Sequence, residues 1–97
     1  MINNSIIPKI FRQIAFNKAW RKLPRVVKKQ SRKAITLFLE NSSHPSLHTH
    51  NLKGKLSEFK SFSVNRDIRI LFREEKDGLH FEGIGNHDDY FKKSNKI

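Results

Sequence analysis

The spacing of the apolar residues changes halfway along the chain, and this change limits the folds that the sequence can adopt. Between residues 26 and 39 the apolar side chains recur at helical spacing and leave cations on the other side of the helical wheel. From Phe62 onward they alternate with polar residues, as they do in half-buried strands. The chain is therefore expected to be α+β, with its helices and strands in separate segments.

The longer expected helix is strongly amphipathic. Pro24 suits its first turn, where a missing N–H does no harm, and Asn41-Ser42-Ser43 is expected to end it. Its apolar side is predicted to consist of Val26, Val27, Ala34, Leu37 and Phe38. Its opposite side carries the cations Arg25, Lys28, Lys29, Arg32 and Lys33. A shorter helix should precede it and end at Leu23, so that the two form a helical hairpin.

Three antiparallel strands are expected to follow as a meander. Their apolar positions are Phe62 and Val64, then Ile68, Ile70 and Phe72, then Leu79 and Phe81. Asn65-Arg66 and Asp77-Gly78 are predicted to form the two hairpin turns. A first strand around Lys9–Gln13 is confined to a strand start or an edge by Pro8. The predicted order is β-α-α-β-β-β, with the helical hairpin packed on one face of a small, mostly antiparallel sheet. We expect a single domain over residues 1–97, with an ordered core of about residues 6–91.

The charge points to a polyanionic partner. Twenty Lys and Arg against nine Asp and Glu leave a formal charge of +11. Residues 1–41 hold ten of the cations and one acid (+9), whereas residues 42–97 hold ten cations and eight acids (+2). RNA is the expected partner, with an anionic membrane or an acidic protein as the alternatives. The lack of cysteine fits a reducing cytoplasm, and no long apolar run predicts a signal peptide or a membrane span.

One face of the predicted sheet should carry polar groups suited to phosphate chemistry. If Ile68, Ile70 and Phe72 face the helices, their alternating neighbours face away from them. Metal-free RNA cleavage needs a base for the 2′-OH proton, a cation for the phosphoryl oxygens and an acid for the leaving 5′-oxygen. Tyr90 or Phe91 would stack a base. The residues expected around this face are Asp67, Arg69, Leu71 and Arg73 from the strand, His50, Lys53 and Lys55 from the preceding loop, and His87 after the last strand.

Plainer interpretations remain open for several of these residues. His44 and His48 are expected to be solvated loop residues, and His80 a surface strand residue. A metal site at His48-Thr49-His50 is rejected because two ligands are too few. Arg69 is equally suited to a structural ion pair with Glu82 or Asp67.

Three motifs in register resemble the RelE/ParE toxin superfamily, closest to its RelE/YafQ-like toxins. They are the runs Pro45-Ser46-Leu47-His48-Thr49-His50-Asn51-Leu52-Lys53-Gly54-Lys55-Leu56, Ser61-Phe62-Ser63-Val64-Asn65-Arg66-Asp67-Ile68-Arg69-Ile70-Leu71-Phe72 and Ile84-Gly85-Asn86-His87-Asp88-Asp89-Tyr90. The resemblance covers roughly Lys9 to Phe91 and agrees with the predicted element order. It implies a type II toxin that cleaves mRNA in the ribosomal A site, without a cofactor, and is silenced by a cognate antitoxin.

The resemblance also implies roles for individual residues. His50 and His87 become an acid-base pair, Asp67 an acidic site residue, Arg69 the cation at the scissile phosphate and Phe91 the tail aromatic. The residues expected to bind RNA are Lys53, Lys55, Arg66, Arg73 and Tyr90, together with Arg25, Lys28, Lys29, Arg32 and Lys33. The rival within the superfamily is a ParE-type, non-catalytic inhibitor of DNA gyrase, and a basic DNA-binding module is a third possibility. The histidines favour the nuclease, because a gyrase binder needs no proton-transfer groups.

Overall fold

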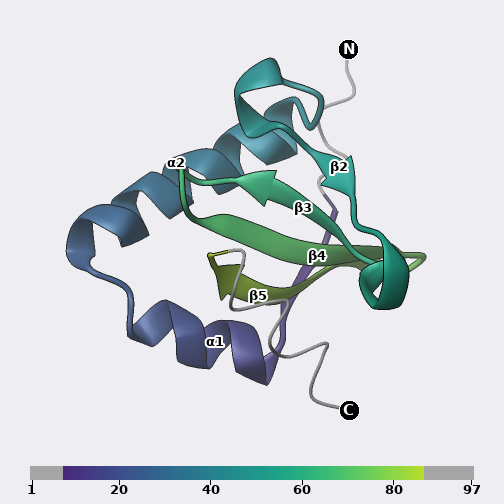
Figure 1. Cartoon of the computed structure of the whole chain (residues 1–97), viewed down its shortest axis with the longest axis horizontal. Helices are drawn as coiled ribbons and strands as arrows, with labels where there is room; N and C mark the ends of the chain where they lie inside the picture. Colours follow the sequence, from purple (N-terminus) through teal and green to yellow (C-terminus); the bar gives the residue numbers. More distant parts are fainter. Residues whose placement is uncertain (1–7, 87–97) are drawn as a thin grey trace.

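Five strands and two α-helices make up the structure, a computed structural model that describes residues 8–86 (Figure 1). The elements in chain order are β1 (Ile10–Arg12), α1 (Ile14–Arg21), α2 (Arg25–Glu40), the 3-10 turn η1 (Pro45–Leu47), β2 (His50–Asn51), the 3-10 turn η2 (Gly54–Leu56), β3 (Lys60–Ser63), β4 (Arg69–Glu75) and β5 (Gly78–Gly85). The predicted α+β architecture is confirmed, with one strand, β2, that the sequence did not suggest. A strand of two residues is too short to show an alternating pattern.

The strands form one sheet in the order β1-β5-β4-β3-β2. The meander β3-β4-β5 is antiparallel as predicted, β2 adds antiparallel to β3, and β1 runs parallel to β5. Both helices follow β1 directly and pack on one side of the sheet, as Figure 1 shows. Within residues 8–86 the other side of the sheet carries no helix, and we call it the helix-free face.

Aromatic side chains dominate the core between the helices and the sheet. Phe38 of α2 stacks on Phe62 with ring centroids 4.4 Å apart and meets Phe72 edge-on at 4.9 Å. Phe16 of α1 packs against Phe81 at 5.4 Å. Each of these rings is at most 5% exposed, so their burial is the main force that joins helices and sheet.

The apolar side of α2 is narrower than predicted. Ala34 and Phe38 are buried as expected, but Val26 is 62% exposed and the polar Ser31 is fully buried. Val26 lies in the first turn of α2, which Figure 1 shows beyond the ends of the strands, so no core surface is there to cover it. Ser31 is tolerated in the core because its hydroxyl donates to the Val27 carbonyl at 2.8 Å.

The connection between β3 and β4 is longer than the predicted two-residue turn at Asn65-Arg66. Val64 and Asn65 both donate backbone hydrogen bonds to the Ile68 carbonyl, so residues 64–68 form the loop. The Asn65 side chain accepts from the backbone N–H groups of Asp67 and Ile68 at 2.9 and 2.8 Å. The loop is therefore wider than the predicted two-residue turn. It is closed by the Asn65 side-chain oxygen, which accepts hydrogen bonds that a backbone carbonyl would accept in a tighter turn.

A bulge in β5 decides which side chains reach the helix side of the sheet. The pairing shifts between Leu71↔Gly83 and Phe72↔Phe81, which leaves Glu82 as the extra residue. Phe81 and Ile84 therefore both point into the core, although they are an odd number of positions apart in the sequence. Leu71 lies on the helix-free face as predicted but is only 8% exposed, so this face is not polar throughout.

Candidate active site on the open sheet face

Arg69 is held rigidly at the start of β4. Its Nε donates to the Ser61 hydroxyl at 2.8 Å and its Nη1 to the Ser63 hydroxyl at 2.7 Å. Its Nη2 donates to the carbonyl oxygens of His48 at 2.6 Å and Ser61 at 3.0 Å. Hydrogen bonds on three sides of the planar guanidinium fix its position before any substrate arrives, which is the preorganisation that stabilises charge on a phosphate.

His50 lies directly beside Arg69, as the sequence predicted. In β2, His50 pairs with Ser61 of β3. The Nδ1 atom of His50 lies 2.9 Å from the His48 carbonyl oxygen and 3.3 Å from Arg69 Nη2. Nδ1 cannot donate to the carbonyl and accept from the guanidinium at once, and the shorter contact favours donation to His48. In the neutral ring Nε2 then carries the lone pair, and His50 is exposed. The arrangement suits a proton acceptor.

The other predicted site residues around the face lie in exposed loops or beyond the described part of the chain. Lys53 and Lys55 lie at and within η2, which follows β2. Arg66 and Asp67 lie in the β3–β4 loop, two to three residues before Arg69. The remaining predicted residues, His87, Tyr90 and Phe91, lie outside residues 8–86.

Arg73, the other arginine that β4 places on this face, is engaged by carboxylates. Its Nε donates to Glu82 at 2.9 Å and its Nη1 to Glu75 at 2.6 Å. The hydrogen bond with Glu82 raises the pKa of the Arg73 guanidinium above its ordinary value. Of the two structural partners suggested for Arg69, Glu82 therefore belongs to Arg73. The RNA contact by Arg73 stays a prediction. Two carboxylates already neutralise the charge of Arg73, which makes it less attractive to phosphate.

His80 is not the plain surface residue that the sequence suggested. Only 14% of its side chain is exposed, and its ring stacks on Phe11 with centroids 4.7 Å apart. Its Nε2 meets the Asp77 carboxylate at 2.8 Å, and Gln13 contacts its Nδ1 at 3.2 Å. The hydrogen bond from His80 lowers the pKa of Asp77. With both ring nitrogens engaged, His80 is a structural link between β1 and the β4–β5 turn.

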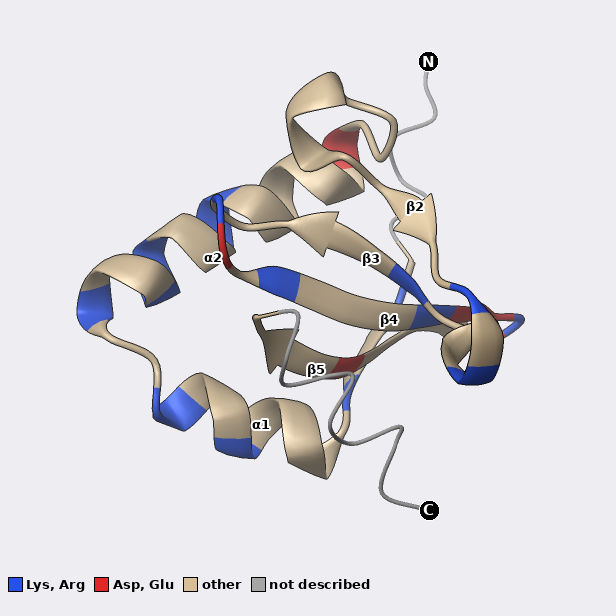
Figure 2. Cartoon of the chain, in the orientation of Figure 1, with Lys and Arg blue, Asp and Glu red and all other residues tan. Residues whose placement is uncertain are grey.

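The cations of α2 form a separate basic surface, which we call the α2 basic face: Arg25, Lys28, Lys29, Arg32 and Lys33. Figure 2 shows blue segments repeated along the first half of α2. All five are exposed or half-buried, and α2 has a single acid, Glu40, at its last residue. The Arg32 guanidinium lies 5.6 Å from the centroid of the Trp20 ring, a cation–π distance.

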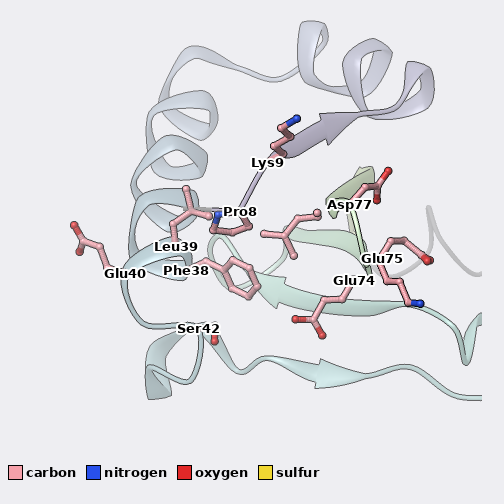
Figure 3. Close-up of a pocket in the computed structure, with 12 residues that line it drawn as sticks. Pro8, Lys9, Phe38, Leu39, Glu40, Ser42, Glu74, Glu75 and Asp77 are labelled. Atoms are coloured by element: carbon pink, nitrogen blue, oxygen red, sulfur yellow. The ribbon is translucent and has the colours of Figure 1, made fainter. Parts of the chain in front are cut away.

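Acidic residues gather at the opposite end of the molecule. A cavity of about 450 Å³ there is lined by residues that include Glu40, Glu74, Glu75 and Asp77 (Figure 3). In Figure 3 the Glu40 carboxylate points away from the other three. Lys9 and Lys76 line the cavity too, so its lining carries four acids and two lysines. This excess of acids makes the cavity a poorer site for phosphate than the α2 basic face.

Metal ligands do not assemble within the described residues. Across residues 8–86 no three or more His, Asp and Glu side chains lie close enough together to hold an ion. His48 is exposed with a left-handed φ of 45°, and its carbonyl, not its ring, is the group that contacts Arg69 and His50. In the same part of the chain no helix is long and apolar enough to cross a bilayer.

Sequence reasoning missed the groups that orient Arg69. Ser61 and Ser63 alternate with Phe62 and Val64, so they lie on the helix-free face, and the hairpin pairs Ser63 with Arg69. That signal was present in the register of the two strands. The His48 carbonyl had no comparable signal, because its position depends on the loop that brings β2 to the sheet edge.

The fold is shared with solved bacterial toxins. The YafQ toxin from Escherichia coli superposes with a TM-score of 0.74 at 18% identity, over 87% of this chain and 98% of that one. The E. coli DinJ–YafQ toxin–antitoxin complex gives a TM-score of 0.72 at 20% identity, over 89% and 99% of the two chains. The YoeB dimer from Staphylococcus aureus gives 0.69 at 12% identity, over 84% and 99%. These likenesses show that the chain has the α+β fold of these proteins.

The sequence narrows this class to a family. The family model of the ParE-like toxin domain matches residues 24–92, well over half of the chain. The chain therefore belongs to the ParE-like toxins, and the predicted membership of the RelE/ParE superfamily is confirmed. No curated protein matches the sequence.

Proposed function

We propose that the protein is the toxin of a type II toxin–antitoxin system and that it kills by cleaving mRNA on the ribosome. The observation that carries the proposal is the Arg69 guanidinium, fixed by Ser61, Ser63 and His48, beside the exposed His50 ring. A gyrase inhibitor has no need of a proton acceptor next to a preorganised cation. The proposed partners are an antitoxin, the ribosome and mRNA, so the proposed place of action is the cytoplasm.

The proposed reaction uses side chains of the protein and no cofactor. His50 Nε2 takes the proton from the ribose 2′-OH, and the resulting oxygen attacks the adjacent phosphorus. The bond from phosphorus to the 5′-oxygen breaks, which leaves a 2′,3′-cyclic phosphate and a 5′-hydroxyl. Arg69 stabilises the charge that develops on the phosphoryl oxygens. His87 donates the proton to the leaving oxygen, with Asp67 and Phe91 as further site residues by their match to the family motif.

The test is primer extension on mRNA from cells that briefly express the protein. We expect cuts inside translated codons, and we expect Arg69→Lys to reduce them at least about 100-fold, because lysine keeps the charge but cannot form the planar fork. Arg21→Lys on the exposed side of α1 is the matched control and should cut like the wild type. Intact mRNA in growth-arrested cells would refute the nuclease.

A second candidate function is inhibition of DNA gyrase, which the match to the ParE-like toxin domain favours. The same fold can carry either activity. A supercoiling assay with purified gyrase separates the two, because a gyrase inhibitor blocks supercoiling in the absence of ribosomes. We expect no inhibition, and inhibition that survives Arg69→Lys would establish the alternative.

A further inference from the structure

His48, which lies between the 3-10 turn η1 and β2, has an unusual backbone conformation. Its φ of 45° and ψ of 46° lie in the left-handed region. Among residues 8–86 it is the one residue other than glycine that has a positive φ. A residue with a Cβ is disfavoured in this region, so the conformation persists because the surrounding contacts hold it.

The chain is anchored on both sides of His48. Before it, Leu47 is 2% exposed and belongs to the core. After it, the Thr49 hydroxyl donates to the Ser42 carbonyl at 3.0 Å, and His50 begins β2. These anchors fix both neighbouring segments, so the reversal of the chain between them falls on His48.

The reversal directs the His48 carbonyl oxygen to two functional groups of the site. This oxygen accepts from Arg69 Nη2 at 2.6 Å and lies 2.9 Å from His50 Nδ1. One backbone oxygen therefore contacts both the cation and the histidine ring. The exposed ring of His48 makes neither contact.

We propose that His48 is a positioning residue, whose left-handed backbone sets the tautomer of His50 and holds its ring beside Arg69. The inference rests on the proposed function, which makes His50 Nε2 the proton acceptor. When Nδ1 donates to the His48 carbonyl, Nε2 of the neutral ring keeps its lone pair and can take the 2′-OH proton.

A second arrangement of the same groups competes with this one. Arg69 Nη2 lies 3.3 Å from His50 Nδ1, and it can donate to that nitrogen once the His48 carbonyl is turned away. Nδ1 is then the acceptor, and the proton of the neutral ring moves to Nε2. A ring that carries its proton on Nε2 cannot accept another one there. The His48 carbonyl thus selects the form of His50 that acts as a base.

The role depends on the backbone conformation at position 48 and not on an imidazole. Glycine adopts a positive φ freely, so His48→Gly keeps the carbonyl in place. Valine has a branched Cβ that clashes in the left-handed region, so His48→Val turns the carbonyl away. His44→Val is the matched control in the same loop, because the φ of −56° and ψ of 131° of His44 suit valine.

NMR of the histidine ring nitrogens measures the tautomer in the whole protein without RNA. In mildly alkaline buffer, where an imidazole is ordinarily neutral, we expect the His50 proton on Nδ1 in the wild type, in His48→Gly and in His44→Val. We expect it on Nε2 in His48→Val. His50→Ala assigns the signal among the five histidines of the chain.

Cleavage of a reporter mRNA in a bacterial translation extract gives the second readout. We expect His48→Val to lower kcat at least about tenfold with KM unchanged, because it impairs proton transfer and not RNA binding. His48→Gly and His44→Val should cleave within about twofold of the wild type. His48→Ala, which carries a smaller side chain, replaces His48→Val if a melting curve shows that the latter does not fold.

The two readouts separate this inference from the proposed function. A proton retained on Nδ1 in His48→Val, or lost from Nδ1 in His48→Gly, would overturn the positioning role. An unchanged kcat in His48→Val despite the shifted tautomer would overturn its link to cleavage. The expected tautomers in a wild-type protein that leaves mRNA intact would support the positioning of His50 and refute the nuclease.

Discussion

Arg69 illustrates why arginine suits this position better than lysine. Three of its nitrogens donate to hydroxyl and carbonyl oxygens of Ser61, Ser63 and His48, a pattern that needs a planar group with donors in fixed directions. A lysine ammonium would keep the charge and lose the orientation. The orienting groups come from β3 and from the loop before β2, so residues distant in the sequence converge on one side chain.

At the same scale, His50 and His44 form a matched pair for testing proton transfer. His44 is only half-buried and uses its Nδ1 to cap η1 through Ser46 at 3.2 Å, away from the Arg69 contacts. We expect His50→Ala to lower the RNA cleavage rate by about 10²- to 10⁴-fold, the usual contribution of a general base. We expect His44→Ala to leave the rate unchanged. Cleavage rates on a reporter mRNA in a bacterial translation extract provide the measurement, and equal rates for wild type and His50→Ala would remove His50 from the mechanism.

At the scale of elements, the β4–β5 turn lies one residue before the predicted Asp77-Gly78 pair: Lys76 and Asp77 form the turn, and Gly78 opens β5 opposite Glu75. Gly78 has a φ of 143°, and a Cβ there would lie 2.4 Å from the Lys9 carbonyl oxygen, which is too close. That carbonyl accepts the hydrogen bond from Leu79 that begins the β1–β5 pairing. Gly78 thus serves both the turn and the close approach of β1.

The prediction at this scale compares two glycines of β5. Gly78→Ala is expected to destabilise the fold by about 1–3 kcal/mol, because it strains the backbone and displaces Lys9. Gly83→Ala should be neutral or stabilising by up to about 1 kcal/mol, because a Cβ at Gly83 meets no atom of residues 8–86 within 4 Å. Urea unfolding of both variants measures the difference, and equal stabilities would contradict the assigned role of Gly78.

On the scale of the whole molecule, charge is separated along the surface. The α2 basic face stands apart from the acidic end, where Glu74, Glu75 and Asp77 are engaged by Lys60, Arg73 and His80. These three carboxylates therefore already have positively charged or histidine partners within the protein. The cations of α2 have no comparable set of acids along their helix.

The corresponding prediction concerns salt dependence. Replacing Lys29 and Lys33 by glutamine should weaken binding to poly(U) and reduce the slope of log K against log salt by about 0.7 for each phosphate that the protein no longer binds. Replacing Lys9 and Lys76, which line the acidic cavity, makes the same charge change and should alter the slope less. Filter binding at several salt concentrations tests both variants, and equal slopes for the two would exclude the α2 basic face as the RNA-binding surface.

The sequence alone determined the class of fold, because periodicity depends only on which residues repeat along each segment. It predicted both helices, the meander and the first edge strand, and it placed Arg69 on the helix-free face beside the loop of His50. It misjudged Val26 and the Asn65 turn, because exposure and loop width depend on where the neighbouring elements end.

Only the tertiary structure decided the details that make the site specific. The two-residue β2 exists because β3 offers it an edge, and its pairing brings the His48 carbonyl and the His50 ring to Arg69. The bulge at Glu82 assigns that carboxylate to Arg73, while Arg69 donates to neutral oxygens of β3 and of the loop before β2. Such contacts join residues far apart in the sequence, and no local pattern encodes their distances.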